Sequence, residues 1–189
     1  MIATLIRKYL IGPIVWIEKL IEKFHKPDCL TTYPQLVDAA SRMINGDILF
    51  ERCDLMLSNW FIPGQWKHCA VYMNGYVYEA SAVGVRRVNF QEWFFKKDHV
   101  GIARYNKVLT VDDQAKGLNF MASCLGDPYN YEFSMSAKTQ WYCSEYVYCF
   151  FKQCDPNFIF PLKSILGDLT VEPTDFWSSS QFTKLVSYN

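Results

Sequence analysis

The dipeptide Asn74-Gly75 constrains the local fold of this chain more than any other feature. It separates two short segments with the composition of β-strands, residues 67–73 and 76–80. Asn-Gly favours a two-residue turn because both residues tolerate positive φ, and such a turn fixes the register of an antiparallel hairpin. We therefore predict that Met73 lies opposite Tyr76, and the rest of the pairing follows by counting.

The predicted register brings a histidine next to a carboxylate. Ala70 lies opposite Glu79, and side chains at directly paired positions point to the same face of a sheet. His68 and Tyr72 share that face with Ala70, so Glu79 becomes the diagonal neighbour of His68. A carboxylate in this position fixes the tautomer of an imidazole and stabilises its protonated form.

Cys143 is the candidate nucleophile. It directly precedes a run of apolar residues at helical spacing, which includes Tyr146, Val147 and Phe150. A thiol in the first turn of a helix lies near the positive end of the helix dipole and near unpaired backbone N–H groups. Both lower its pKa, and the N–H groups can also bind an oxyanion. These are the requirements of a catalytic cysteine.

The other segments predict a mixture of helices and strands with no internal repeat or linker. We expect helices over residues 35–44, 112–125, from Cys143 onward and near 175–178, with Asn45-Gly46 closing the first; strands over 47–50, 85–88, 100–105 and 183–187; and an irregular aromatic loop over 54–66.

Composition and charge limit the classes of function that fit this chain. The chain has 189 residues, with 19 basic and 19 acidic side chains, which fits one domain and lacks the basic patch of a nucleic-acid binder. Seven cysteines without a Cys-x-x-Cys pair indicate neither a disulfide framework nor a zinc ribbon, so we predict a cytoplasmic protein. Cys69 points to the face opposite His68, and no metal-ligand spacing occurs elsewhere. We predict no metal site and no cofactor.

The first 30 residues read as an amphipathic helical extension of a catalytic domain that spans residues 31–189. Apolar residues recur at helical spacing after a break at Gly12-Pro13. The longest uncharged run, residues 9–17, is far shorter than the ~20 residues that span a bilayer. The extension either packs on the core of the domain or contacts a membrane surface peripherally.

Seven short motifs follow one another in order between residues 46 and 177. They are Gly46-Asp47-Ile48-Leu49-Phe50, His68-Cys69-Ala70-Val71-Tyr72, Val77-Tyr78-Glu79-Ala80, Gly84-Val85, Gly126-Asp127-Pro128-Tyr129-Asn130, Tyr142-Cys143-Ser144-Glu145 and Glu172-Pro173-Thr174-Asp175. In this order they resemble the circularly permuted, NlpC-type papain-like cysteine hydrolases, in particular the YiiX-like branch.

The resemblance implies an α+β, circularly permuted papain-like fold, with an antiparallel sheet or small barrel packed against helices. The N-terminal helices expected from the apolar spacing are extra to it, because the first 30 residues match no motif of the family. The resemblance also implies roles for three residues: Cys143 as nucleophile, His68 as general base and Glu79 as the orienting group. Tyr129 is implied more loosely as a residue that lines the site. We add Tyr72 and Trp66 as candidate substrate contacts.

Three functions fit these residues. The preferred one is a thiol hydrolase that cleaves an amide or ester through an acyl-enzyme, on a small-molecule, peptide or lipid-like substrate with an apolar part. If the acyl group passes to an acceptor other than water, the same site is an acyltransferase. The third is a lipid- or acyl-binding module that keeps the fold without turnover, which the aromatic loop and the N-terminal segment suggest.

Overall fold

The computed structural model describes residues 30–54, 64–135, 139–165 and 168–188. In chain order the elements are α3 (Tyr33–Arg42), β1 (Ile48–Arg52), β2 (His68–Met73), β3 (Tyr76–Ser81), β4 (Gly84–Asn89), α4 (Phe90–Phe94), β5 (His99–Tyr105), α5 (Val111–Ser123), α6 (Cys143–Cys154), β6 (Lys163–Ile165), β7 (Asp168–Thr170), α7 (Pro173–Ser178) and β8 (Phe182–Tyr188). The α+β class predicted from the sequence is confirmed.

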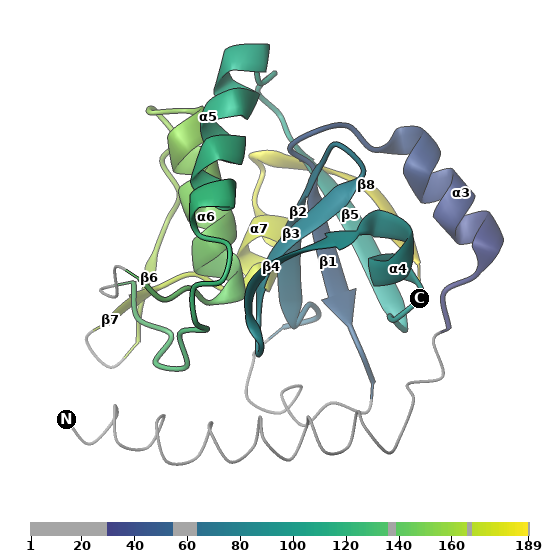
Figure 1. Ribbon diagram of the computed structural model, residues 1–189, viewed down its shortest axis with the longest axis horizontal. Coiled ribbons are helices and arrows are strands. Elements are labelled where there is room, and N and C mark those ends of the chain that lie inside the picture. The colour runs from purple at the N-terminus through teal and green to yellow at the C-terminus, as the bar shows by residue number, and fades with distance from the viewer. Residues whose placement is uncertain (1–29, 55–63, 136–138, 166–167, 189) are drawn as a thin grey trace.

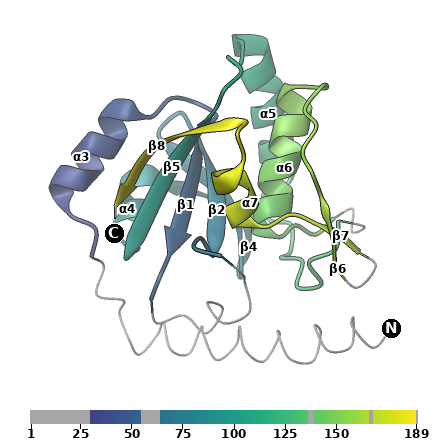
Figure 2. The ribbon, with the colours of Figure 1, turned by 180° about the vertical axis from the view of Figure 1, so that it is seen from behind.

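An antiparallel sheet of six strands, ordered β4-β3-β2-β1-β5-β8, forms the centre of the molecule. Helices α5 and α6 cover one face, and α3 and α4 lie on the other side (Figures 1 and 2). The core is divided accordingly. One buried cluster joins Phe150 of α6 to Val71 of the sheet, and a second joins Leu36 of α3 and Trp93 of α4 to Ala70. Alternate residues of β2 therefore belong to different clusters.

The hairpin has the predicted register. Met73 pairs with Tyr76 across the turn. Asn74 and Gly75 have φ values of 52° and 83°, as a two-residue turn with both residues in the left-handed region requires. The turn thus fixes which residues of β2 and β3 share a face, and this places His68 and Glu79 on the same side of the sheet.

The boundaries of some elements differ from the sequence prediction. Helix α3 ends at Arg42 with the extended Met43 as its C-cap, so Asn45-Gly46 forms the turn into β1 and does not cap the helix. The short helix α4 was not predicted, although the side chain of Asn89 accepts a hydrogen bond from the backbone N–H of Gln91, an ordinary N-cap signal. The strands β6 and β7 were also missed. The predicted N-terminal helices and most of the aromatic loop lie outside the described residues.

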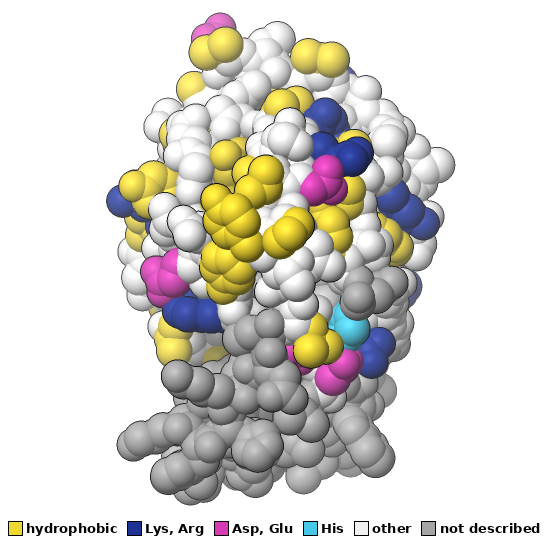
Figure 3. Space-filling view, turned by 90° about the vertical axis from the view of Figure 1, so that its right-hand side faces the viewer, with side chains coloured by type: hydrophobic (Ala, Val, Ile, Leu, Met, Phe, Trp, Pro, Cys, Tyr) yellow, Lys and Arg dark blue, Asp and Glu magenta, His cyan; other side chains and the backbone are white. Residues whose placement is uncertain are grey.

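Exposed apolar side chains lie on and beside α3. Tyr33 and Val37 of the helix and the flanking Leu30 and Ile44 are exposed, and Figure 3 shows hydrophobic side chains gathered on this side of the molecule. The opposite face of the helix buries Leu36 against the sheet. None of the helices within the described ranges has the length and apolarity needed to span a membrane.

Candidate active site

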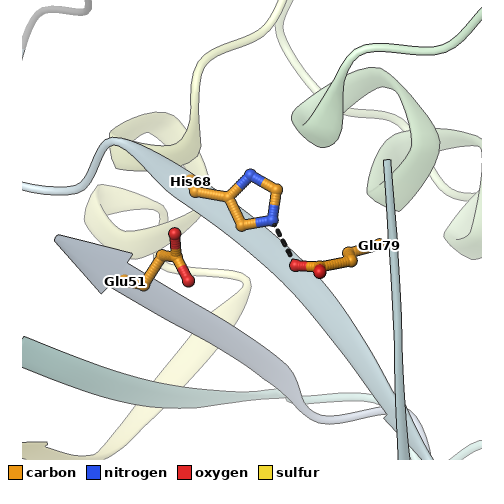
Figure 4. A group of neighbouring side chains, drawn as sticks. All are labelled: Glu51, His68 and Glu79. Carbon is orange, nitrogen blue, oxygen red and sulfur yellow. Dashed lines mark hydrogen bonds and ion pairs between the residues drawn. The ribbon is translucent and has the colours of Figure 1, made fainter. Parts of the chain in front are cut away.

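His68 and Glu79 form a close pair on the sheet. His68 is the first residue of β2, and its Nε2 lies 2.8 Å from Oε2 of Glu79 on β3 (Figure 4). The Glu79 side chain is only 1% exposed, whereas that of His68 retains 15% of its surface. The carboxylate is therefore a buried partner of a ring that solvent still reaches.

Two further donors hold the Glu79 carboxylate. Arg86 of β4, its cross-strand neighbour, donates from Nε to Oε1 over 2.7 Å, and the indole N–H of Trp93 donates to Oε2 over 3.0 Å. Burial alone would raise the pKa of Glu79. The hydrogen bond and charge of His68, together with the charges of Lys97 and Arg86, outweigh burial and hold this pKa below its ordinary range. Glu79 is thus ionised at neutral pH.

Cys143 is the first residue of α6 and is almost fully buried. The thiolate form of Cys143 is favoured by the thiol and backbone N–H of Cys69 and by the imidazole of His68. These interactions overcome burial and hold the pKa of the Cys143 thiol well below its ordinary value. Because Nε2 of His68 is bonded to Glu79, Nδ1 is the ring nitrogen left for the sulfur.

The imidazole is protonated in this environment. Burial favours the neutral ring, but the negative charge of Glu51 and the hydrogen bonds to Cys143 and Glu79 raise the pKa of His68 to about 10. With the pKa of the thiol lowered and that of the imidazole raised, the electrostatics of the site favour a thiolate–imidazolium ion pair over two neutral groups.

Tyr129 lies beside the sulfur. Besides burial, interaction with the sulfur of Cys143 raises the pKa of the Tyr129 hydroxyl, whereas the backbone N–H of Cys143, as a donor to the hydroxyl oxygen, lowers it. A parallel bridge between Tyr129 and Trp141 ties its loop to the chain that enters α6. Burial raises the pKa of Tyr129 well above its ordinary value, so the phenol stays neutral and can donate its proton in a hydrogen bond.

Trp66 and Tyr72 do not join this group. Trp66 is completely buried and packs edge-on against Trp177, with ring centroids 5.1 Å apart. Tyr72 packs against Phe90 at 5.8 Å in the cluster under α3 and α4. Trp66 therefore has no surface left for a substrate contact. Tyr72 is only partly buried, so its substrate contact stays a prediction.

An antiparallel sheet that presents a histidine hairpin to the start of a later cysteine-bearing helix is the architecture of a permuted papain-like protein. The family model described as permuted papain-like amidase enzyme, YaeF/YiiX, C92 family, matches residues 42–187, and the chain belongs to this family. The crystal structure of metalloprotein yiiX from Escherichia coli O157:H7 is similar, with 19% identity and a TM-score of 0.65 over 76% of this chain and 97% of that one. No curated protein matches the chain significantly.

Because that neighbour is titled a metalloprotein, we asked whether residues of this chain fit a metal ion. Glu51, His68 and Glu79 each bring one ligand-type atom within 4.8 Å of the others. However, Lys97 pairs with Glu51, Arg86 pairs with Glu79, and Nε2 of His68 bonds to Glu79. A metal ion needs unprotonated ring nitrogen and carboxylates free of competing cations. The arrangement described does not fit a metal ion.

Proposed function

We propose that this protein is a cysteine-dependent amide hydrolase in which Cys143 is the nucleophile, His68 the general base and acid, and Glu79 the residue that orients His68. One observation carries the proposal: the imidazole that favours the thiolate of Cys143, at the start of α6, bonds through Nε2 to a buried carboxylate at 2.8 Å. Membership of the amidase family supports the same reaction class.

The reaction proceeds by acyl transfer to sulfur. The Cys143 thiolate attacks the carbonyl carbon and the C=O π pair moves onto oxygen; as the tetrahedral adduct collapses, the imidazolium of His68 protonates the leaving amine. Neutral His68 then takes a proton from water, whose oxygen attacks the thioester. The acid leaves, and the proton held by His68 restores the ion pair. Glu79 keeps Nε2–H in place throughout, so that Nδ1 always faces the reacting atoms.

We propose two donors for the oxyanion of the tetrahedral adduct. The backbone N–H of Cys143 belongs to the first turn of α6, where N–H groups have no partner within the helix. The hydroxyl of Tyr129 lies against that same backbone and sulfur. Donors aimed at the position where negative charge develops stabilise the transition state more than the bound substrate.

For the acyl part of the substrate we propose an apolar group. Support comes from the aromatic surroundings of Tyr129, whose ring centroid lies 4.9 Å from that of Tyr131 and 6.1 Å from that of Phe133. Apolar walls with few polar groups are typical of ligand sites. Comparing p-nitrophenyl acetate with p-nitrophenyl octanoate tests this point, because the longer chain should give the higher kcat/KM.

The first experiment tests the ion pair and the acyl-enzyme together. Iodoacetamide labelling at pH 6 is followed at each cysteine by peptide mass spectrometry, in the wild type and in His68→Ala. We expect Cys143 to react fastest and to lose that advantage without His68. Incubation with p-nitrophenyl acetate should leave an acetyl group on Cys143 in the wild type only.

Cys149 is the matched control, because it lies on the same helix and burial raises its pKa to about 12. Equal labelling of Cys143 and Cys149 at pH 6 in both proteins would refute the ion pair. A Cys143 that never reacts would also count against a hydrolase, since a substrate carbonyl must reach the same sulfur. If Cys143→Ala then retained binding of octanoate, the acyl-binding module would be the better account.

A further inference from the structure

A second carboxylate lies next to His68. Glu51 of β1 is the cross-strand partner of His68, and Figure 4 shows the imidazole between the carboxylates of Glu51 and Glu79. One carboxylate oxygen from each glutamate and one ring nitrogen lie within 4.8 Å of one another. The reaction proposed above gives Glu51 no role, so the position of this carboxylate beside the imidazole needs an explanation.

Lys97 holds Glu51 in place. Its ammonium forms an ion pair with Oε2 of Glu51, and the two side chains are only 12% and 15% exposed. The same ammonium lies 5.0 Å from the ring centroid of Trp93, the residue that donates to Glu79. A buried carboxylate without a cation is costly, and Lys97 removes that cost for Glu51 as Arg86 does for Glu79.

Each of the two glutamates has its own cationic partner, Arg86 for Glu79 and Lys97 for Glu51, and this leaves a definite role for Glu51. Arg86 reaches Glu79 with two nitrogens, at 2.6 and 2.7 Å, and neutralises much of the charge that Glu79 would offer to His68. With Cys143 as thiolate, the described groups around His68 include three anions, Glu51, Glu79 and Cys143. The matching cations are His68 itself, Lys97 and Arg86, of which Arg86 is the solvent-exposed one, with 46% of its side chain accessible. Without Glu51 the set would carry an excess positive charge, which His68 relieves most readily by losing its proton.

We propose that Glu51, clamped by Lys97, is a second positioning residue that keeps His68 protonated and thereby maintains the resting ion pair with Cys143. The inference rests on the proposed function. Among the described residues, the charged and titratable groups that face His68 are Glu51 from β1, Glu79 from β3 and Cys143 from α6. Lys97 and Arg86 act through the two glutamates, and Tyr129 acts through Cys143.

The test is the titration of the His68 imidazole, followed by NMR of ring-labelled histidine. We expect Glu51→Gln to shift its titration down by about 1–3 pH units, because an adjacent opposite charge shifts a pKa by that amount. The alkaline limb of p-nitrophenyl acetate hydrolysis should move down with it. Glu92→Gln is the control, because Glu92 is an exposed residue of α4 that pairs with Lys96.

Glu51→Gln leaves the Lys97 ammonium without its carboxylate and can impair folding for that reason. The double variant Glu51→Gln/Lys97→Met removes both charges of the pair and keeps the charge balance of the set. Because Glu51 is the cross-strand partner of His68, with an oxygen within 4.8 Å of a ring nitrogen, the titration should still move down, but by less than in Glu51→Gln. An unchanged titration in a folded variant would overturn the proposal.

Two other experimental outcomes would have a different meaning from an unchanged titration. If Cys143 lacks fast, His68-dependent labelling in the wild type, the proposed function itself is wrong. If EDTA shifts the wild-type titration, or Zn²⁺ binds to the wild type and not to Glu51→Gln, Glu51 serves a metal ion and the positioning role is refuted.

Discussion

The indole N–H of Trp93 donates to Oε2 of Glu79 over 3.0 Å, and this is the same oxygen that faces Nε2 of His68. One carboxylate oxygen therefore links a helix on one side of the sheet to the imidazole. Trp93 is nearly inaccessible to solvent, so water does not replace the bond if it is lost.

We predict that Trp93→Phe lowers the free energy of unfolding by about 2 kcal/mol, because a buried, charge-assisted hydrogen bond is lost. It should also slow the labelling of Cys143 at pH 6, since Glu79 is less firmly held. Urea denaturation and labelling kinetics measure the two effects.

Trp66→Phe is the matched control for this change. Within the described part of the chain, the buried Nε1 of Trp66 has no hydrogen-bond partner. Its loss should therefore cost only packing contacts and leave the reactivity of Cys143 unchanged. If the two variants behaved alike, the hydrogen bond from Trp93 would have no special role.

The activity should have an unusual pH range. A thiolate–imidazolium pair exists above the pKa of the thiol, which is lowered, and below the pKa of His68, which is raised to about 10. Acylation by p-nitrophenyl acetate should thus begin well below the ordinary thiol pKa of about 8.5 and decline as the pH rises through about 10. A stopped-flow pH profile checks this expectation. A single rise near pH 8.5 with no alkaline decline would show an ordinary thiol.

Gly84 should be far less replaceable than Gly75. Both have positive φ, at 102° and 83°, but a Cβ on Gly84 would lie 2.7 Å from the carbonyl oxygen of Asp127, whereas one on Gly75 meets open space. We predict that Gly75→Ala costs about 1 kcal/mol of stability and Gly84→Ala about 3 kcal/mol.

Urea denaturation of the two glycine variants measures the difference. Gly84→Ala should also slow the labelling of Cys143, because Asp127 belongs to the loop that carries Tyr129 and accepts a hydrogen bond from Val85 over 2.8 Å. Equal costs in the two variants would show that the loop moves aside freely.

The part of the site that depends on local geometry could be predicted from the sequence. A two-residue turn permits only one register for the hairpin, and the alternation of side chains along each strand then decides which of them share a face. This reasoning placed Glu79 beside His68. It also placed Cys69 on the other face, which is the one that packs against α6. The start of α6 at Cys143 followed from the apolar spacing behind it.

The rest depends on contacts between segments that are distant in the chain. Glu51 pairs with His68 because β1 lies beside β2, but the loop between these strands is too long to fix a register. Trp93 and Lys97 lie on or just after the unpredicted helix α4, so their approach to the site had no sequence signal. The approach of Arg86 did have a sequence signal, because Arg86 lies opposite Glu79 in a hairpin whose strands are joined by a two-residue turn.

The placement of Trp66 and Tyr72 shows a different limit of prediction from sequence. An aromatic residue near a catalytic motif can line a site or fill a core, and the sequence pattern is the same in both cases. Trp66 packs against Phe50 and Trp177, and Tyr72 packs against Phe90 of α4. Only the tertiary packing distinguishes these outcomes.

The thiol and its base come from different layers of the molecule. His68, Glu79 and the residues that hold them are carried by the sheet and by α4, whereas Cys143 arrives with α6, which packs on the opposite face. A folding intermediate that has formed the sheet but has not docked α6 would already contain the complete base and would still be chemically silent. The acid-pH reactivity predicted for Cys143 would therefore report the packing of α6 on the sheet, and the time at which it appears in a refolding experiment would time that step.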